Sequence, residues 1–395
     1  MRTWKNYGVR SGDVPSEKKC SDDDAEPVMR IDLIITELFV GGAEKCITEL
    51  ALSLHDKGDR VRVFSVGSLP TGEQSQLVDR LKTAGIVVES AECDSVSRAI
   101  SAYRFLKRRF IEDKPDLVQT FLHHANILGV HAARSAGISK CVAGIRVAEN
   151  QRFRNHLERI SLRRADHTLC VSRAVERFTK EVLKCASNRT SVIPNGVHLD
   201  QFTGITPSDW SSIGWPEDAK VILFIGRFDH QKGIDLLQEQ IDSLAPAGTK
   251  QKLLLIGDGP LRDPTQQWAL KMGKDRVQCL PWQSEVASWI AASELLVLPS
   301  RYEGMPNVLL EAMASAKPVV CSLVEGSEEL LGPTRLIQGF KSGSGDELAL
   351  RVTNLMNQEE LRRELGSENR ERISAHHSMP RIMDEYRNFY LSLLR

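Results

Sequence analysis

Short apolar runs and longer amphipathic stretches alternate along the chain from residue 29 onward. Periodic patterns predict helices between the apolar runs, among them 42–57, 73–84 and 96–112. This strand–helix rhythm predicts a mostly parallel sheet with helices on both faces. The apolar runs predict buried strands at 30–36, 60–66, 86–89, 116–120, 140–145 and 167–171.

The rhythm breaks in a Pro- and Gly-containing stretch at 195–217, which we interpret as an interdomain linker. A second βα series follows, with strands predicted at 221–225, 252–256, 276–280, 294–298 and 318–321. The fold class is therefore α/β, with two consecutive Rossmann-like domains that each hold a parallel sheet. We predict a disordered leader at 1–28, a first domain at 29–198 completed by a C-terminal helix at 380–395, and a second domain at 199–379.

Composition narrows the class of protein without identifying it. Hydrophobic residues make up 41% and charged residues 26%, which is ordinary for a globular protein. Lys plus Arg and Asp plus Glu each number 52, so no global field favours nucleic acid as a partner. The basic runs 107–109 and 163–164 are predicted to be solvated helix faces. The eight cysteines form no C-x-x-C pair and no zinc spacing, which predicts a reducing, cytoplasmic compartment and no metal site.

The most informative stretch is 300–314, Ser-Arg-Tyr-Glu-Gly-Met-Pro-Asn-Val-Leu-Leu-Glu-Ala-Met-Ala. Glu303 lies in a Gly/Pro loop after an apolar strand, and Glu311 follows about one turn into the helix that the loop opens. We place Pro306 in the first helical turn, where its missing N–H would be unpaired anyway. The free amides of Gly304, Met305 and Asn307 would then form an anion site, beside two carboxylates that can accept hydroxyl groups.

Basic residues follow the first strand of the second domain, at the edge of the sheet where that loop is expected. Arg227 and Lys232 would stabilise a diphosphate leaving group from this position. Gly257 ends the next strand in a tight turn, and Leu280 ends the third, where a nucleotide base could bind. Both could equally be structural positions.

The first domain offers fewer candidates. Gly42 opens its first helix, where a glycine lets a ligand approach the backbone amides. His124 follows the fourth strand, where it could orient a donor sugar or bind an acceptor. Asp32, Arg146 and Glu149 are further polar residues that we place near the cleft edge without ranking them.

Four motifs together resemble the retaining GT-B glycosyltransferases of family 4. They are Gly41-Gly42-Ala43-Glu44, Ile193-Pro194-Asn195-Gly196-Val197, Gly226-Arg227-Phe228 with Lys232-Gly233, and Glu303-x7-Glu311. The resemblance covers residues from about 29 to the C-terminus. It implies that the two parallel sheets face each other across a cleft, with the donor nucleotide held by the second domain and the acceptor by the first.

The resemblance implies roles for the candidate residues. Arg227 and Lys232 would bind the diphosphate, and Glu311 the ribose hydroxyls. Glu303 and the amides of 304–307 would hold the donor sugar and distal phosphate, with Gly42 near the phosphates. It further implies no metal or cofactor, and a UDP- or GDP-linked sugar as donor substrate.

The chain departs from the family pattern at one point. Many members carry His-x-His after the fourth strand, whereas Gln119-Thr120-Phe121 stands here. His124, in a His-Ala-Asn found in some relatives, could take that place.

The resemblance also implies a reaction and its partners. An acceptor hydroxyl would attack from the side on which the diphosphate leaves, with retention at the anomeric carbon. Lipid-linked or oligosaccharide acceptors are usual among relatives, which implies surface-polysaccharide or glycolipid synthesis and peripheral contact with the inner membrane face.

Two other functions remain open from the sequence. A sugar-nucleotide 2-epimerase would use the same fold, although the first domain lacks an obvious cluster of carboxylates and histidines. A non-catalytic nucleotide-sugar-binding partner is compatible with the missing His-x-His. A nicotinamide-dependent dehydrogenase is disfavoured, because no strand is followed by G-x-G-x-x-G with a later acidic residue.

Overall fold

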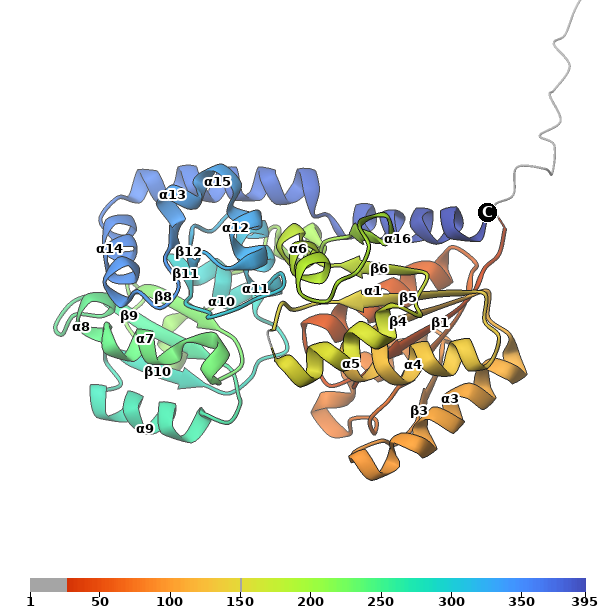
Figure 1. Cartoon of the computed structure of the whole chain (residues 1–395). Coiled ribbons are helices and arrows are strands. Elements are labelled where there is room, and N and C mark those ends of the chain that lie inside the picture. Colours follow the sequence, from red (N-terminus) through yellow and green to blue (C-terminus); the bar gives the residue numbers. More distant parts are fainter. Residues whose placement is uncertain (1–26, 150) are drawn as a thin grey trace, which may run out of the picture.

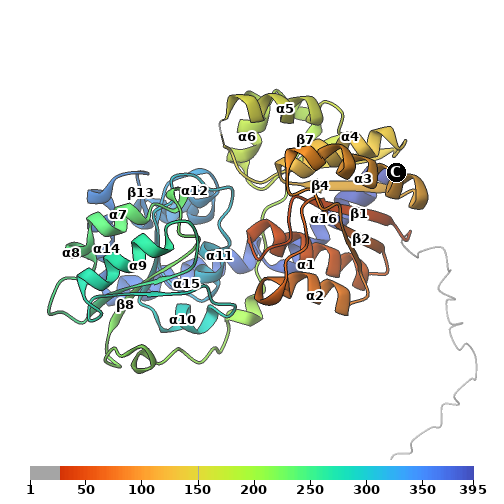
Figure 2. The same cartoon turned by 90° about the horizontal axis from the view of Figure 1, so that it is seen from below.

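Two α/β domains lie side by side in the computed structural model, which describes residues 27–149 and 151–395 (Figures 1 and 2). The predicted leader falls outside the described residues, except for its last two positions. Each domain has one parallel sheet, in the order β3-β2-β1-β4-β5-β6-β7 and β10-β9-β8-β11-β12-β13. Both orders place a topological switch point at the first strand of the domain, where α/β proteins bind ligands.

The first domain has a parallel sheet whose strands are separated by helices. Its strands are β1 (Arg30–Ile35), β2 (Arg60–Ser65), β3 (Val87–Ser90), β4 (Leu117–Phe121), β5 (Lys140–Ile145), β6 (His167–Cys170) and β7 (Thr190–Val192). Its helices are α1 (Gly42–Asp56), α2 (Gln76–Thr83), α3 (Ala99–Asp113), α4 (His123–Ser135), α5 (Arg152–Leu162) and α6 (Arg173–Glu181).

The second domain repeats the plan. Its strands are β8 (Lys220–Ile225), β9 (Gln251–Ile256), β10 (Val277–Leu280), β11 (Leu295–Leu298), β12 (Val319–Ser322) and β13 (Gly339–Phe340). Its helices are α7 (Ile234–Glu239), α8 (Ile241–Leu244), α9 (Arg262–Met272), α10 (Ala287–Ala292), α11 (Asn307–Ala314), α12 (Glu325–Leu331), α13 (Arg335–Gln338) and α14 (Gly345–Met356).

The predicted strands are all present, with bounds within one residue of those expected. The short strands β7 and β13 were not predicted. The stretch 195–217 contains 3-10 turns at Leu199–Phe202 and Trp210–Ile213, and Trp210 and Trp215 are buried. Trp210 packs against Trp215 and Trp289, so part of this stretch is core and not only a linker.

Two helices close the chain along one side of the molecule, α15 (Glu359–His376) and α16 (Met379–Leu394) (Figure 1). α15 packs on α11 of the second domain, and α16 packs on α1 of the first, as predicted. Ile382, Tyr386 and Tyr390 of α16 are buried in one hydrophobic cluster with β1 and α1. The chain therefore crosses between the domains twice, and Val197 and Ser378 of the two crossings form a β-bridge.

Candidate functional site

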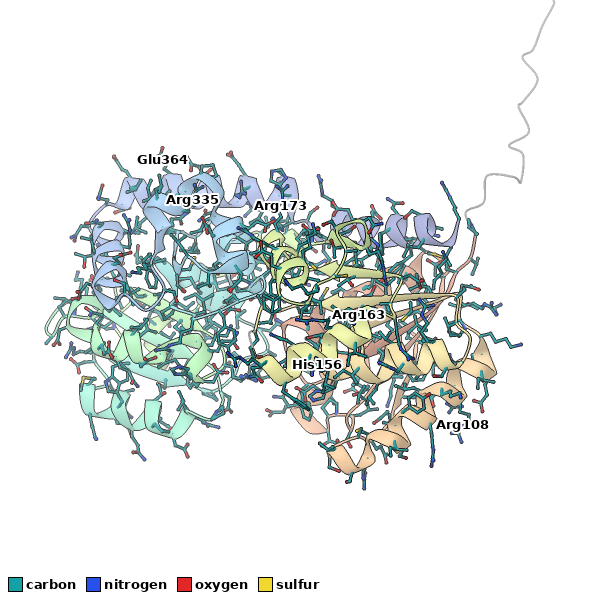
Figure 3. All side chains as sticks on the ribbon, in the orientation of Figure 1. Arg108, His156, Arg163, Arg173, Arg335 and Glu364 are labelled. Atoms are coloured by element: carbon teal, nitrogen blue, oxygen red, sulfur yellow. The ribbon has the colours of Figure 1, made fainter. Side chains whose placement is uncertain are left out.

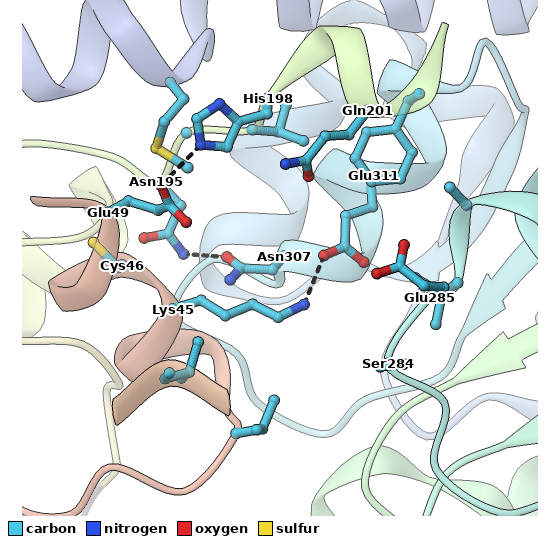
Figure 4. Close-up of a pocket in the computed structure, with 18 of the residues that line it drawn as sticks. Lys45, Cys46, Glu49, Asn195, His198, Gln201, Ser284, Glu285, Asn307 and Glu311 are labelled. Carbon is cyan, nitrogen blue, oxygen red and sulfur yellow. Dashed lines mark hydrogen bonds and ion pairs between the residues drawn. The ribbon is translucent and has the colours of Figure 1, made fainter. Parts of the chain in front are cut away.

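A pocket of about 390 Å³ opens between the two domains (Figure 4). The first domain contributes α1 and α2, with Lys45 and Glu49 among the lining residues. The second contributes the segment 282–287 together with Asn307 and Glu311 of α11. Two residues of the predicted donor site thus face the first domain across a shared pocket.

The loop between β11 and α11 is organised around a buried carboxylate. Oε1 of Glu303 lies 2.5 Å from Nζ of Lys232 and accepts a hydrogen bond of 2.7 Å from the Ser300 hydroxyl. The Glu303 backbone amide donates to Oε2 of Glu325 at 2.9 Å. Burial and the neighbouring Glu303 charge raise the pKa of Glu325. Lys232 is therefore the cation that compensates a buried, carboxylate-rich turn.

The same loop presents unpaired backbone amides. Among residues 27–149 and 151–395, no acceptor pairs with the amides of Gly304, Met305 or Asn307. Pro306 is extended, with φ −74° and ψ 120°, and α11 begins at Asn307. The prediction that Pro306 lies in the first helical turn is therefore wrong by one position, because its extended ψ places it at the N-cap. Unpaired amides at the positive end of a helix are groups that can bind an anion.

Arg227 lies in the loop after β8, with 67% of its side chain exposed. Its Nε donates to Oδ2 of Asp229 at 2.5 Å, and Asp229 accepts a bond of 3.2 Å from the Lys232 amide. This arrangement leaves the rest of the guanidinium free for a ligand. Gly257 packs against the start of this loop: a Cβ at its position would lie 1.9 Å from the Gly226 carbonyl oxygen, so the close approach requires a glycine.

Leu280 has a backbone role in the same region. Its carbonyl oxygen accepts a bond of 3.1 Å from the Gly257 amide. Neither Leu280 nor Gly257 lines the pocket, whereas Trp282, two residues after Leu280, does.

Glu311 and Asn307 are tied to the first domain (Figure 4). Nζ of Lys45 lies 3.3 Å from Oε1 of Glu311, whose side chain is 14% exposed. Nδ2 of Asn307 donates to the Gly42 carbonyl oxygen at 3.3 Å. Gly42 is thus brought beside the α11 loop, and its predicted place near the phosphates stays a prediction. Lys45 is a pocket residue that no motif in the sequence indicated.

A buried polar network also joins the domains, and its partners are too far apart in sequence to be paired by pattern. The Arg146 guanidinium at the end of β5 donates to Asn195 Oδ1 and, at 3.4 Å, to the Tyr386 hydroxyl. Nδ2 of Asn195 donates to the Met305 carbonyl oxygen at 2.9 Å and to Asn307 Oδ1 at 2.8 Å. The network holds the α11 loop against the first domain.

The histidines lie at the start of α4, after Leu122, whose φ of 72° is unusual for a branched residue. His124 is exposed, and desolvation lowers its pKa, with His123 adding to the effect. His123 is buried, and its Nδ1 lies 3.2 Å from Oε2 of Glu158. Neither histidine lines the interdomain pocket.

Two of the polar residues expected near the cleft edge, Asp32 and Glu149, form ion pairs within the first domain. Asp32 does not reach the cleft edge: it lies early in β1 and pairs with Arg62 at 2.5 Å. Its carboxyl is buried, and burial raises its pKa to about 6. Glu149 pairs with Arg154 at 2.5 Å beyond the end of β5. Among the described residues, no group of His, Cys, Asp and Glu side chains could hold a metal ion.

The basic runs behave as surface helix residues. Arg108 on α3 and Arg163 after α5 carry side chains on the outside of the first domain (Figure 3). Arg108 lies 3.7 Å from Glu112, and Arg109 pairs with both Glu89 and Glu112. No helix in the described part of the chain has the length and apolarity needed to span a membrane.

Comparisons with known proteins cover both domains. The profile of the family Glycosyltransferase Family 4 matches residues 40–201, and that of Glycosyl transferases group 1 matches residues 208–372. The chain is 32% identical over 214 residues to an uncharacterised glycosyltransferase of Methanocaldococcus jannaschii, over 52% of this chain and 54% of that protein. It is 29% identical over 251 residues to UDP-Gal:alpha-D-GlcNAc-diphosphoundecaprenol alpha-1,3-galactosyltransferase of Escherichia coli, over 59% and 63%. The matched regions thus span about half to two thirds of these relatives.

Solved structures share the architecture. HepE of Anabaena, crystallised with UDP, superposes with a TM-score of 0.78 at 19% identity, covering 92% of this chain and 100% of that one. TarM of S. aureus superposes with a TM-score of 0.73 at 13% identity, covering 92% and 99%. With both domains matched by family profiles and the two parallel sheets arranged as in these structures, the chain belongs to the family-4 glycosyltransferases of GT-B fold.

Proposed function

We propose that the chain transfers a hexosyl group from a nucleoside-diphosphate sugar to an acceptor hydroxyl, with retention of anomeric configuration. The observation that carries the proposal is the α11 loop. Unpaired amides, the Lys232 ammonium and the Glu311 carboxylate gather there beside a pocket between the domains. Amides and a cation suit a diphosphate, and a carboxylate suits ribose hydroxyls.

Each residue then has a role in the reaction. The diphosphate binds the amides of 304–307, Lys232 and Arg227, and the ribose binds Glu311. As the anomeric C–O bond breaks, negative charge develops on the leaving diphosphate, and the two cations stabilise it. The acceptor oxygen forms the new bond on the same face, and its proton passes to the departing phosphate oxygen. A single charge-stabilising donor contributes about 3 kcal/mol to such a step.

Related proteins support the choice of substrates. HepE was crystallised with UDP and with UDP-glucose. The E. coli relative is named for a galactosyl transfer to a lipid diphosphate, and an LpsD relative of Rhizobium meliloti for lipopolysaccharide core synthesis. We extend these names to a UDP- or GDP-linked donor, a lipid-linked or oligosaccharide acceptor, and peripheral contact with a membrane.

Isothermal calorimetry tests the donor site directly. We expect saturable binding of one of UDP, GDP or ADP in the absence of metal, with affinity reduced at least tenfold in Glu311→Ala and Arg227→Ala. The control is Glu364→Gln, which removes an exposed carboxylate of α15 that does not line the pocket, and this variant should bind as the wild type does. The proposal is refuted if none of the three nucleotides binds, or if both site variants bind with unchanged affinity.

A further inference from the structure

Glu44 is a buried carboxyl at the cleft end of α1 that the reaction above does not use. It lies in the first turn of the helix, with 8% of the residue exposed. Its side chain folds back on Gly41, since a Cβ added to Gly41 would lie 2.3 Å from Glu44 Oε2. Gly41 therefore provides the space that this carboxyl occupies.

The carboxyl has no cation of its own. Within residues 27–149 and 151–395, no Lys, Arg or His comes within 4.0 Å of Glu44. The next residue on the helix, Lys45, pairs with Glu311. Its own backbone amide favours the ionised form and so lowers the pKa of the carboxyl in part.

Charges on other elements act on Glu44 only at longer range. Glu37, in the loop after β1, opposes its ionisation, whereas Arg146, directly after β5, and Arg227 of the second domain favour it. Arg146 is already engaged by Asn195 and Tyr386. Burial outweighs these charges and raises the pKa of Glu44 to about 7.

Glu44 is close to the donor site because the helical turn that carries it contacts the second domain. The Gly42 carbonyl oxygen is 3.3 Å from Nδ2 of Asn307, so the first turn of α1 lies against the anion site of α11. An ionised carboxylate there would repel a bound diphosphate. A neutral carboxyl offers an O–H donor instead, as a protonated acid does at an oxyanion.

We propose that Glu44 binds the donor diphosphate as the neutral acid, donating a hydrogen bond to a phosphate oxygen from the first turn of α1. This inference rests on the proposed function, because it needs a diphosphate in the cleft. Its consequence is that donor binding takes up a proton near neutral pH, whereas a purely structural carboxyl would leave binding independent of the buffer.

Calorimetric titration with UDP-glucose between pH 6 and 8.5 tests the proposal, since the diphosphate diester of this probe does not titrate in that range. We expect wild-type affinity to fall by close to tenfold per pH unit above about pH 7. Binding enthalpies in two buffers of different ionisation enthalpy should show proton uptake. Glu44→Gln keeps an N–H donor without a titrating proton, so its affinity should lie within threefold of wild type at pH 6 and stay flat as pH rises.

The matched control is Glu37→Gln, which removes the neighbouring exposed carboxylate and should retain the proton uptake. Wild-type binding without pH dependence overturns the inference, and so does uptake that persists in Glu44→Gln. If Glu44→Gln does not fold, Gly41→Ala is used instead, because the added methyl group displaces the Glu44 carboxyl. Loss of proton uptake in this variant supports the inference, and retained proton uptake refutes it. Absence of UDP-glucose binding at every pH overturns both this inference and a UDP-glucose donor, whereas binding without uptake overturns the inference alone.

Discussion

The ion pair between Lys232 and Glu303 should govern the stability of the second domain. Its atoms lie 2.5 Å apart, and the side chains are 17% and 8% exposed. Lys232→Met would leave a buried carboxylate with the Ser300 hydroxyl, at 2.7 Å, still donating to it. Breaking a buried pair costs roughly 3–5 kcal/mol, and we expect about 3 kcal/mol because Lys232 is partly exposed and the Ser300 bond remains.

Urea unfolding followed by tryptophan fluorescence measures the lost free energy of unfolding in the second domain. Five of the six tryptophans lie in the second domain, at 210, 215, 268, 282 and 289. A shift of the midpoint at unchanged slope gives the lost free energy of unfolding. Lys250→Met is the control, because Lys250 pairs with Asp218 on the surface, where the side chains are 64% and 59% exposed. Its midpoint should not move.

The double variant Lys232→Met/Glu303→Gln separates the buried charge from lost packing. Most of the cost comes from the uncompensated carboxylate, so neutralising it should restore more than half of the lost free energy. The reasoning fails if Lys232→Met costs less than about 1 kcal/mol, the size of an average point substitution, or if the double variant is no more stable than the single one.

Further predictions concern catalysis, pH and the contact between the domains. Arg227→Ala should lower kcat/KM by about 10²–10³ in steady-state assays while leaving the urea midpoint unchanged, because the side chain is 67% exposed; a loss within about threefold would contradict its role. His377 is buried, its Nδ1 lies 3.1 Å from the Asn195 carbonyl oxygen, and desolvation lowers its pKa from 6.5 to about 4. Below pH 6.5 the unfolded chain binds this proton first, so the free energy of unfolding should fall between pH 6.5 and 4, and less so in His377→Gln, by urea titration at each pH. Gly304→Ala would place a Cβ 1.6 Å from the Arg146 carbonyl oxygen and so push the α11 loop away from the first domain. Calorimetry should then show at least tenfold weaker nucleotide binding, and unchanged affinity would contradict a role for this contact in binding.

The sequence predicts the sheets well because each strand is a continuous apolar run bounded by Gly, Pro or polar residues. β7 and β13 escape detection because Thr190–Val192 and Gly339–Phe340 are too short to show a period. The residues of the candidate site were predictable where they stand next to such clearly marked elements. Glu303, Lys232 and Asn307 could be anticipated because each stands at a strand end or helix start, where parallel sheets gather their loops.

What the sequence could not provide are the pairings between distant residues. Lys45 looks like any exposed helix lysine until α11 is placed opposite it, and Asn195 looks like a turn residue until Arg146 and Met305 surround it. Asp32 reads as a polar residue near a cleft, yet it lies early in its strand and its partner is Arg62. Such contacts depend on how strands pair within a sheet and on how the two domains meet, and no local pattern encodes either.

The position of α16 has a consequence for how the molecule is made. The core of the first domain includes Ile382, Tyr386 and Tyr390, and Arg387 of the same helix binds Asp59 at 2.9 Å. All of the second domain lies between β7 and this helix in the chain. During synthesis the first domain emerges from the ribosome before the second. The hydrophobic surface that α16 covers therefore stays exposed until the second domain and α16 have also been synthesised. The domain that is translated earlier is the one that can be completed only later.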